Sequence, residues 1–236
     1  MRVCYLTKMK SVFSISDLPV IKVAGKDHCY PVRRIFCVGR NYVDHALELG
    51  NEVDRKQPFY FTKSAFSLLS SEKDFTYPPM TKDLHHEIEL VVAIAKPLQK
   101  ATREELADYI FGYACGLDMT RRDLQSLAKK QGKPWDMSKD FEGSAIIGEI
   151  TAAKEVPEIQ NANLNLFLNN KLQQHGRIPD MIYSVDEILL DLSKYTQLIP
   201  GDLIMTGTPA GVSSVKKGDL LVAKIDGLTD LKVKIT

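Results

Sequence analysis

The sequence predicts a β-rich α+β fold, a mixed β-sandwich or roll, and three observations support this prediction. Short apolar or alternating segments follow one another closely along the chain, which is typical of folds built from many short strands. The segments with helical spacing are few and short. Turn dipeptides of Gly and Asp separate the segments near the C-terminus. These features disfavour a doubly wound α/β fold, in which strands alternate with long helices.

The N-terminal half of the chain predicts a short lead-in followed by strands and helices. Residues 1–32 have no sustained period, and we interpret them as a lead-in with one or two short strands ahead of a single domain over 33–236. Asn41 is expected to cap the first helix, and Thr102 and Glu105 form a capping box for the second. The predicted strands are 33–39, 59–63, 74–79, 86–96 and 113–120, and the predicted helices are 41–50, 102–109 and 121–130.

The C-terminal half predicts a hairpin, one helix and three further strands. An Asn169-Asn170 turn joins the two hairpin strands, because Asn tolerates the left-handed backbone that such turns require. Ser184 and Glu187 form a second capping box, which starts a helix over 185–195. After this helix, turns at Gly201-Asp202, Gly218-Asp219 and Asp226-Gly227 separate three short strands.

The composition excludes several functional classes. Of 236 residues, 44% are hydrophobic and 26% are charged, so we expect a packed core rather than disorder. The formal net charge of +1 gives no reason to expect binding to nucleic acid or to a membrane. The four cysteines, Cys4, Cys29, Cys37 and Cys115, form no CxxC pair and predict buried, reduced thiols. Without a secretory signal or a long apolar run, the predicted location is cytoplasmic.

Three acidic residues lie in or at the end of predicted apolar strands. Glu87 and Glu89 are two residues apart, so both carboxylates project from one face of a strand, and Asp118 lies near the end of a later strand. Neighbouring carboxylates in a half-buried sheet repel one another, and a hard divalent cation offsets this repulsion. Three carboxylates favour Mg²⁺, with Mn²⁺ and Ca²⁺ as alternatives. His85 and His86 leave zinc open, and a solvated strand face explains the Glu pair equally simply.

Two further pairs share a helical face. His45 and Glu48 are three residues apart, and a carboxylate beside an imidazole orients it and favours its protonated form, as behind a general base. Arg122 and Gln125 have the same spacing on the helix that follows the third acid. Lys139 lies in a polar loop, and such cations and amides suit a site where an oxyanion develops. Solvated surface side chains would explain each pair in isolation.

The segment TGTPAGV, residues 206–212, is a Gly- and Thr-rich loop after an apolar strand. Its backbone N–H groups could cradle a carboxylate, although a plain turn is an equal explanation. The loop has neither the GK[ST] ending of a P-loop nor the GxGxxG pattern, so nucleotide binding is not expected. For Tyr42 and Trp135 we expect core packing rather than a place in the pocket.

Six segments, taken in order, resemble the fumarylacetoacetate hydrolase family, and most closely its branch that acts on acylpyruvates and oxaloacetate. They are VGRNYVDHALELG, FTK, LHHEIELVVAIAK, GYACGLDMTRRDLQ, KPWDMSKDFEGSA and LIMTGTPAGV. The resemblance runs from about Ile35 to the C-terminus. It implies a mixed β-sandwich roll of that family's C-terminal-domain type, assembled as a homodimer, with 33–236 as the catalytic domain.

The resemblance also implies a role for each candidate residue. The implied metal ligands are Glu87, Glu89 and Asp118, the catalytic residues are His45, Glu48 and Lys139, and the substrate-binding residues are Arg122, Gln125, Lys63 and Thr208. Relatives often have Pro and Gly where this chain has Ser64 and Ser213. Both positions border the expected pocket, so these departures affect the preferred substrate side group more than the chemistry.

The implied function is that of a Mg²⁺-dependent enzyme acting on small 2-oxo acids with a 4-carbonyl group. As an acylpyruvate hydrolase, of the fumarylpyruvate or acetylpyruvate type, it would cleave a C–C bond through an enolate that the metal stabilises. The alternatives are an oxaloacetate keto–enol tautomerase and a decarboxylase, which the same machinery supports. A non-catalytic Ca²⁺-binding module is an alternative of another class, in which protein groups would fill the coordination sphere.

Overall fold

The computed structural model describes residues 18–48, 55–70 and 73–236. The helices are α1 (Val43–Glu48), α2 (Arg122–Gln131), α3 (Asp136–Lys139) and α4 (Val185–Tyr195). The 3₁₀ helices are η1 (Ala65–Ser67), η2 (Arg103–Tyr109), η3 (Ala153–Glu155), η4 (Ile159–Asn161) and η5 (Ile178–Asp180). The strands are β1 (Val20–Lys22), β2 (Cys29–Pro31), β3 (Arg34–Gly39), β4 (Phe59–Lys63), β5 (Leu68–Ser70), β6 (Leu84–His85), β7 (Ile88–Ile94), β8 (Ile110–Asp118), β9 (Thr120–Arg121), β10 (Ala145–Ile147), β11 (Thr151–Ala152), β12 (Asn163–Leu168), β13 (Lys171–Arg177), β14 (Asp202–Met205), β15 (Ser214–Val215), β16 (Leu220–Ile225) and β17 (Leu231–Lys234).

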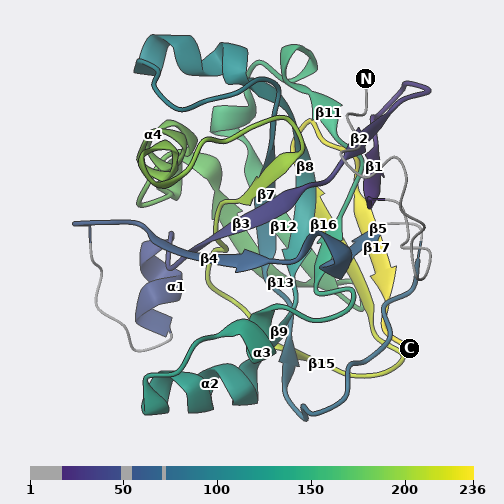
Figure 1. Ribbon diagram of the computed structural model, residues 1–236. Helices are drawn as coiled ribbons and strands as arrows, with labels where there is room; N and C mark the ends of the chain where they lie inside the picture. The colour runs from purple at the N-terminus through teal and green to yellow at the C-terminus, as the bar shows by residue number, and fades with distance from the viewer. Residues whose placement is uncertain (1–17, 49–54, 71–72) are drawn as a thin grey trace, which may run out of the picture.

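Two sheets form most of the fold. An eight-stranded mixed sheet has the order β4-β3-β14-β7-β8-β10-β5, with β11 beside β8 (Figure 1). A four-stranded sheet has the order β13-β12-β16-β17, and β12 and β16 pack against β7 and β8. The smaller sheets are β1-β2 and β15-β6-β9. This arrangement confirms the predicted β-rich α+β sandwich roll.

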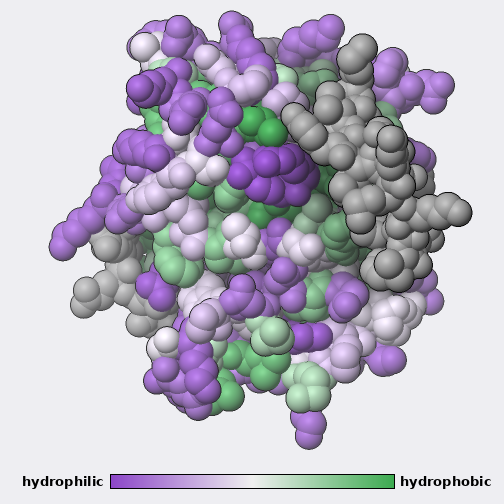
Figure 2. All heavy atoms as spheres, viewed as in Figure 1, coloured by the Kyte–Doolittle hydropathy of each residue, from purple (hydrophilic) through white to green (hydrophobic). Residues whose placement is uncertain are grey.

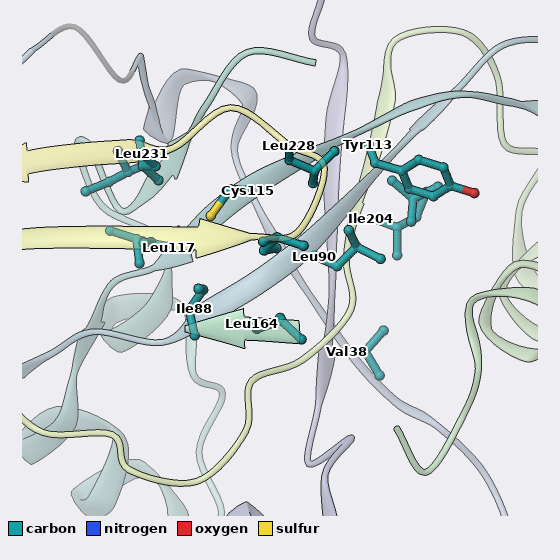
Figure 3. Close-up of a cluster of buried hydrophobic side chains, with 14 of the residues drawn as sticks. Val38, Ile88, Leu90, Tyr113, Cys115, Leu117, Leu164, Ile204, Leu228 and Leu231 are labelled. Atoms are coloured by element: carbon teal, nitrogen blue, oxygen red, sulfur yellow. The ribbon is translucent and has the colours of Figure 1, made fainter. Parts of the chain in front are cut away.

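The side chains of the central strands alternate between two cores. Ile88 and Leu90 of β7 lie in the larger core, between the two sheets, with Cys115 and Leu117 of β8 (Figure 3). Val91, which follows Leu90, lies in a smaller core on the opposite face, which the β1-β2 hairpin covers. Glu89 and Asp118 alternate with these apolar residues, so strand periodicity places them on the face of the smaller core.

The helices gather at the ends of the main sheet. In Figure 1, α1, α2 and α3 lie at its lower end and α4 lies near the upper end. The surface in the same view is mostly hydrophilic at its rim, with apolar side chains between the polar ones (Figure 2). No helix within the described ranges is long and apolar enough to cross a membrane.

Both capping boxes and the Asn turn are confirmed. Glu105 Oε2 accepts from Thr102 N–H at 2.8 Å, and Glu187 Oε2 accepts from Ser184 N–H at 2.8 Å. The paired hairpin strands are β12 and β13, and the φ angles of the two turn residues are 50° at Asn169 and 67° at Asn170.

Two predicted elements are wrong. The segment 74–79 is not a strand: Phe75 alone forms a bridge, to Ile235, and the adjacent prolines Pro78 and Pro79 cannot donate to a ladder. The helix predicted over 102–109 is the 3₁₀ helix η2, which leads directly into β8.

Two predictions for individual residues also fail. The Asn41 side chain does not cap α1, because its Oδ1 accepts from Tyr183 N–H, at 2.7 Å, and its Nδ2 donates to the carbonyls of Tyr183 and Thr206. Cys29 is exposed, whereas Cys37 and Cys115 are buried and unpaired as expected. Cys4 lies outside the described residues.

Candidate active site

Three buried carboxylates meet at the end of β7 and β8. Glu87 precedes β7, Glu89 lies within it and Asp118 ends β8. The antiparallel register brings Asp118 beside Glu87, whose carbonyl accepts from Asp118 N–H at 2.9 Å. One carboxylate oxygen from each of the three residues lies within 4.8 Å of the other two. The pairing of β7 with β8 therefore places three carboxylates close together in the buried interior.

Three cations surround these acids. Lys139 Nζ lies 2.8 Å from Glu87 Oε2 and 2.6 Å from Asp118 Oδ2. Arg122 Nη2 also donates to Glu87 Oε1, and Lys63 Nζ lies 2.8 Å from Asp118 Oδ1. Burial raises the pKa of Glu87, but Lys139 and Arg122 outweigh burial and hold this pKa well below its usual value. Glu87 is therefore ionised.

The surroundings of Glu89 shift its pKa in the opposite direction to that of Glu87. Among the described residues, its one hydrogen-bond donor is Gly207 N–H, 2.7 Å from Oε2. Burial, together with the charges of Asp118 and Glu87, raises the pKa of Glu89 well above its usual value. A nearby divalent cation would reverse this shift by favouring the charged carboxylate.

The acid cluster fits a hard divalent cation. Asp118 Oδ1 is buried and forms an ion pair with Lys63 at 2.8 Å, but it accepts no hydrogen bond from the described residues, so a lone pair remains for a metal. A small pocket of about 20 Å³ adjoins the three carboxylates, which is roughly the room that one ion or water needs. The set is all oxygen, which suits Mg²⁺, Mn²⁺ or Ca²⁺.

The two neighbouring histidines do not complete a zinc site. Neither belongs to the acid cluster that could hold a metal within the described part of the chain. His85 Nε2 lies 2.9 Å from Asp83 Oδ1, and its Nδ1 accepts from Arg122 Nε at 3.4 Å. His86 is held by hydrogen bonds to Gln174 and Ser213.

The predicted His45–Glu48 pair forms on α1 and lines the same pocket through His45. His45 Nδ1 lies 3.3 Å from Glu48 Oε2, and Gly211 N–H donates to both carboxylate oxygens of Glu48 at 3.2 Å. Glu48 favours the protonated imidazole, as expected, but burial has the larger effect on the pKa of His45. Burial lowers the pKa of His45, and the charge of Glu87 and the hydrogen bond to Glu48 offset this only in part. A neutral imidazole is able to accept a proton.

The Gly- and Thr-rich loop cradles carboxylates of the protein itself. Its two glycine N–H groups bind Glu89, through Gly207, and Glu48, through Gly211. Gly211 has a φ of +94°, and a Cβ there would lie 2.1 Å from the backbone oxygen of Gln173. Glycine is thus required at this position, and the loop ties the metal-facing acid to the short helix α1.

Arg122 and Gln125 share one face of α2, as predicted, and both line the small pocket. Arg122 Nη1 donates to Gln125 Oε1 at 2.6 Å, so the amide nitrogen of Gln125 remains available as a donor. Thr208 and Lys139 line the same pocket, and Lys63 reaches it through its ion pair with Asp118. The structure therefore brings all ten predicted site residues together.

A buried hydrogen-bond chain behind Thr208 was not predicted. Gln174 Oε1 accepts from Ile88 N–H at 3.1 Å and lies 2.9 Å from His86 Nδ1, so Gln174 Nε2 must be the donor to Thr208 Oγ1 at 2.8 Å. Thr208 Oγ1 thus accepts one hydrogen bond and keeps its own hydrogen for another acceptor. Ser213 Oγ lies 2.9 Å from His86 Nε2, which completes the chain.

A wide cavity of about 1220 Å³ opens beside the small pocket. The two spaces share five lining residues, which are Arg40, Phe61, Lys129, Trp135 and Lys139. Trp135 lines both spaces, so the expectation of core packing for this residue is wrong, whereas Tyr42 is buried in the core as expected. A small molecule can therefore reach the acid cluster through an aromatic-walled opening.

Known proteins are similar to this chain in sequence and in fold. The chain is 42% identical to the fumarylpyruvate hydrolase of a Ralstonia species, over 79% of this chain and 98% of that protein. It is 38% identical to oxaloacetate tautomerase YcgM of Escherichia coli, over 84% of this chain and 90% of that protein. A crystal structure of fumarylpyruvate hydrolase from Pseudomonas aeruginosa in complex with Mn²⁺ and pyruvate superposes with a TM-score of 0.92, at 38% identity, covering 96% of this chain and 99% of that one.

The family assignment follows from these matches. The profile of the family described as fumarylacetoacetate (FAA) hydrolase C-terminal matches residues 34–236. The resemblance of the six segments is thereby confirmed. The chain belongs to the fumarylacetoacetate hydrolase family and is an enzyme of that family.

Proposed function

We propose that this chain is a Mg²⁺-dependent acylpyruvate hydrolase, which cleaves 2,4-dioxo acids and releases pyruvate. The observation that carries the proposal is the set of three buried carboxylates within 4.8 Å of one another, with His45 lining the same pocket. The similar proteins named fumarylpyruvate hydrolase, one of them holding Mn²⁺ and pyruvate, support both the substrate class and the divalent metal.

The reaction divides one water between two products. His45 takes a proton from the water, which adds to the C4 carbonyl of the substrate. The C3–C4 bond then breaks, its electron pair passes to C3, and the acyl group leaves as a carboxylic acid. The proton held by His45 returns to C3, which gives pyruvate. Glu48 keeps the imidazole in the tautomer with Nδ1–H, so Nε2 is the nitrogen that carries the proton.

The residues around the acids would bind the pyruvate half. Glu87, Glu89 and Asp118 would hold the Mg²⁺, which supplies Lewis-acid polarisation to the C1 carboxylate and C2 oxo group when bound. The amide nitrogen of Gln125 and the hydroxyl of Thr208 are free donors that face the same pocket. The role of these donors is to orient the carboxylate.

The charges of two lysines and one arginine offset the negative charge that develops on the substrate. Lys139 is buried, and although burial lowers its pKa, Asp118 and Glu87 raise it above its usual value. Lys139 therefore stays a cation throughout turnover and acts by charge rather than by proton transfer. Lys63 and Arg122 contribute in the same way from their ion pairs with Asp118 and Glu87.

Oxaloacetate keto–enol tautomerisation is the second candidate, favoured by the 38% identity to oxaloacetate tautomerase YcgM. It needs a proton to move to or from C3, but it needs no water at C4. A His45→Ala variant that loses hydrolysis but retains tautomerisation would show that His45 activates the water and that another group moves the proton at C3. Homodimer assembly is a further proposal and decarboxylation a further alternative, both from the family resemblance, and the cytoplasmic location is proposed from the sequence features given above.

An assay of purified protein with three substrates tests the proposal. Fumarylpyruvate, acetylpyruvate and enol-oxaloacetate are offered side by side, each with Mg²⁺ and with EDTA. We expect an acylpyruvate to be consumed with release of pyruvate, and EDTA to stop the reaction. Rapid enol-to-keto conversion of oxaloacetate without cleavage of either acylpyruvate would overturn the hydrolase assignment in favour of the tautomerase.

A further inference from the structure

Two cations line the opening between the small pocket and the wide cavity. Lys129 lies on the face of α2 that also carries Arg122 and Gln125, and Arg40 follows β3. Within residues 18–48, 55–70 and 73–236, neither Lys129 nor Arg40 has an acidic partner in ion-pair range. Their contacts are instead aromatic: Lys129 Nζ lies 5.1 Å from the Trp135 ring centre, and Arg40 Cζ lies 5.8 Å from that of Phe59.

The charges in the metal pocket balance without Lys129 and Arg40. Three acids there face three basic side chains, which are Lys63, Lys139 and Arg122. A divalent cation would add two positive charges, which the C1 carboxylate and the developing enolate oxygen of the substrate would offset. No negative charge of the pyruvate half is then left for Lys129 and Arg40.

The environment of Lys129 and Arg40 is energetically unfavourable without a ligand. Burial lowers the pKa of Lys129 to about 8, with smaller contributions from Arg122 and Arg40. Arg40 has a φ of 60°, in the left-handed region that non-glycine residues rarely adopt, and such strain is concentrated at functional sites. A bound anion between the two cations would relieve their repulsion.

The aromatic wall indicates the shape of the group that carries this anion. Trp135 lies 4.8 Å from Phe59 and 5.9 Å from Phe61 between ring centres, and all three line the wide cavity. Flat faces of this kind pack well against a planar, unsaturated chain. Phe61 and Trp135 line both the small pocket and the wide cavity, so an acyl group that extends from the small pocket into the wide cavity would pass along this wall.

We propose that Lys129 and Arg40 bind a second carboxylate, at the far end of the acyl group. These two residues would then select an acyl group terminated by a carboxylate, as in the substrate named for the similar fumarylpyruvate hydrolases, over a simple alkanoyl group. This inference rests on the proposed function, because it assumes that the pyruvate half occupies the small pocket.

The kinetic test compares Lys129→Met with Lys130→Met, a matched change at an exposed lysine next to it on α2. We expect Lys129→Met to lower kcat/KM for fumarylpyruvate at least about 10-fold more than for acetylpyruvate, since hydrogen bonds to charged groups contribute about this much. Lys130→Met should leave both values unchanged. Equal loss on both substrates, or no loss on either, would overturn the inference. An equally large loss for oxaloacetate would also overturn it, because the anion recognised would then be a carboxylate attached directly at C3.

A binding test keeps the inference separate from the proposed function. Fumarate and crotonate share a planar alkene and one carboxylate, but only fumarate carries the second carboxylate. With Mg²⁺ and pyruvate present, we expect the wild-type protein to bind fumarate at least about 10-fold more tightly than crotonate in calorimetry, and this preference to disappear in Lys129→Met and in Arg40→Gln. Equal affinity for both acids would refute the subsite. Failure of the wild type to cleave any acylpyruvate, with the preference intact, would refute only the hydrolase.

Discussion

Removal of the Lys139 ammonium should destabilise the protein strongly when metal is absent. Lys139 is 2% exposed and bridges Glu87 and Asp118, at 2.8 and 2.6 Å. In Lys139→Met an apolar side chain of similar length fills much of the space, but the two carboxylates lose a shared counter-charge. Removing one partner of a buried ion pair costs about 3–5 kcal/mol. Because Lys63 and Arg122 still neutralise part of the charge, we expect the lower end of this range.

A divalent cation should restore part of the lost stability. A ligand present at about 100 times its Kd stabilises the folded state by about 2.7 kcal/mol. The gain should be larger in Lys139→Met than in the wild type, because the ammonium no longer competes with Mg²⁺ for Glu87 and Asp118. For a chain of this size, 1 kcal/mol corresponds to roughly 2–4 °C in Tm, so the metal-free loss is a shift of about 6–12 °C.

Urea unfolding in EDTA and in Mg²⁺ measures both effects. The matched control is Lys194→Met, whose ammonium is 2.9 Å from Asp191 but whose side chain is 71% exposed, so its loss should be below about 1 kcal/mol in either buffer. A loss in Lys139→Met as small as that of the control, or an equal Mg²⁺ gain in variant and wild type, would refute the argument that this lysine and the metal share the same carboxylates.

Three further predictions follow from the loop and from His45. Because burial lowers the pKa of His45 below its usual value, the acidic limb of kcat/KM should have its midpoint below that of a free imidazole, as low pH protonates the ring; an acidic limb centred above pH 7 would contradict this. Gln174→Leu removes the donor to Thr208, which should raise KM about 5- to 30-fold with little change in kcat; an unchanged KM in steady-state kinetics would exclude this positioning role. Gly211→Ala should lower the free energy of unfolding in urea by more than about 1 kcal/mol, because its φ is +94° and its Cβ would meet Gln173; a stability equal to wild type would show that the loop relaxes freely.

The sequence predicted those features of the fold that depend on local patterns. Capping boxes, the Asn169-Asn170 turn and the apolar strands follow from residues close together in the chain, and each is present in the structure. The failures also have local causes. Pro78 and Pro79 end what otherwise reads as a strand, and residues 103–109 form a 3₁₀ helix, whose i,i+3 spacing a capping box does not distinguish from an α-helix.

The candidate site was predictable only where strand periodicity or a family segment marked a residue. Glu87 and Glu89 share a face because they are two residues apart, but the approach of Asp118 depends on the register between β7 and β8. Gln174 lies 88 residues from His86 and in none of the six segments, so no pattern marked it. The net pKa direction of His45 depends on burial, which the pair with Glu48 does not reveal.

The most direct test of the central claim is the pair of measurements on Glu89→Gln: Mg²⁺ affinity by calorimetry and pyruvate release from fumarylpyruvate at the same metal concentration. Glu89→Gln preserves the size of the side chain and removes one negative oxygen from the cluster. If Glu87, Glu89 and Asp118 hold the catalytic cation, Mg²⁺ affinity should fall at least about 10-fold, and pyruvate release should fall with it and recover in part at higher Mg²⁺. Wild-type affinity and wild-type pyruvate release in this variant would contradict the assignment of the metal to these carboxylates.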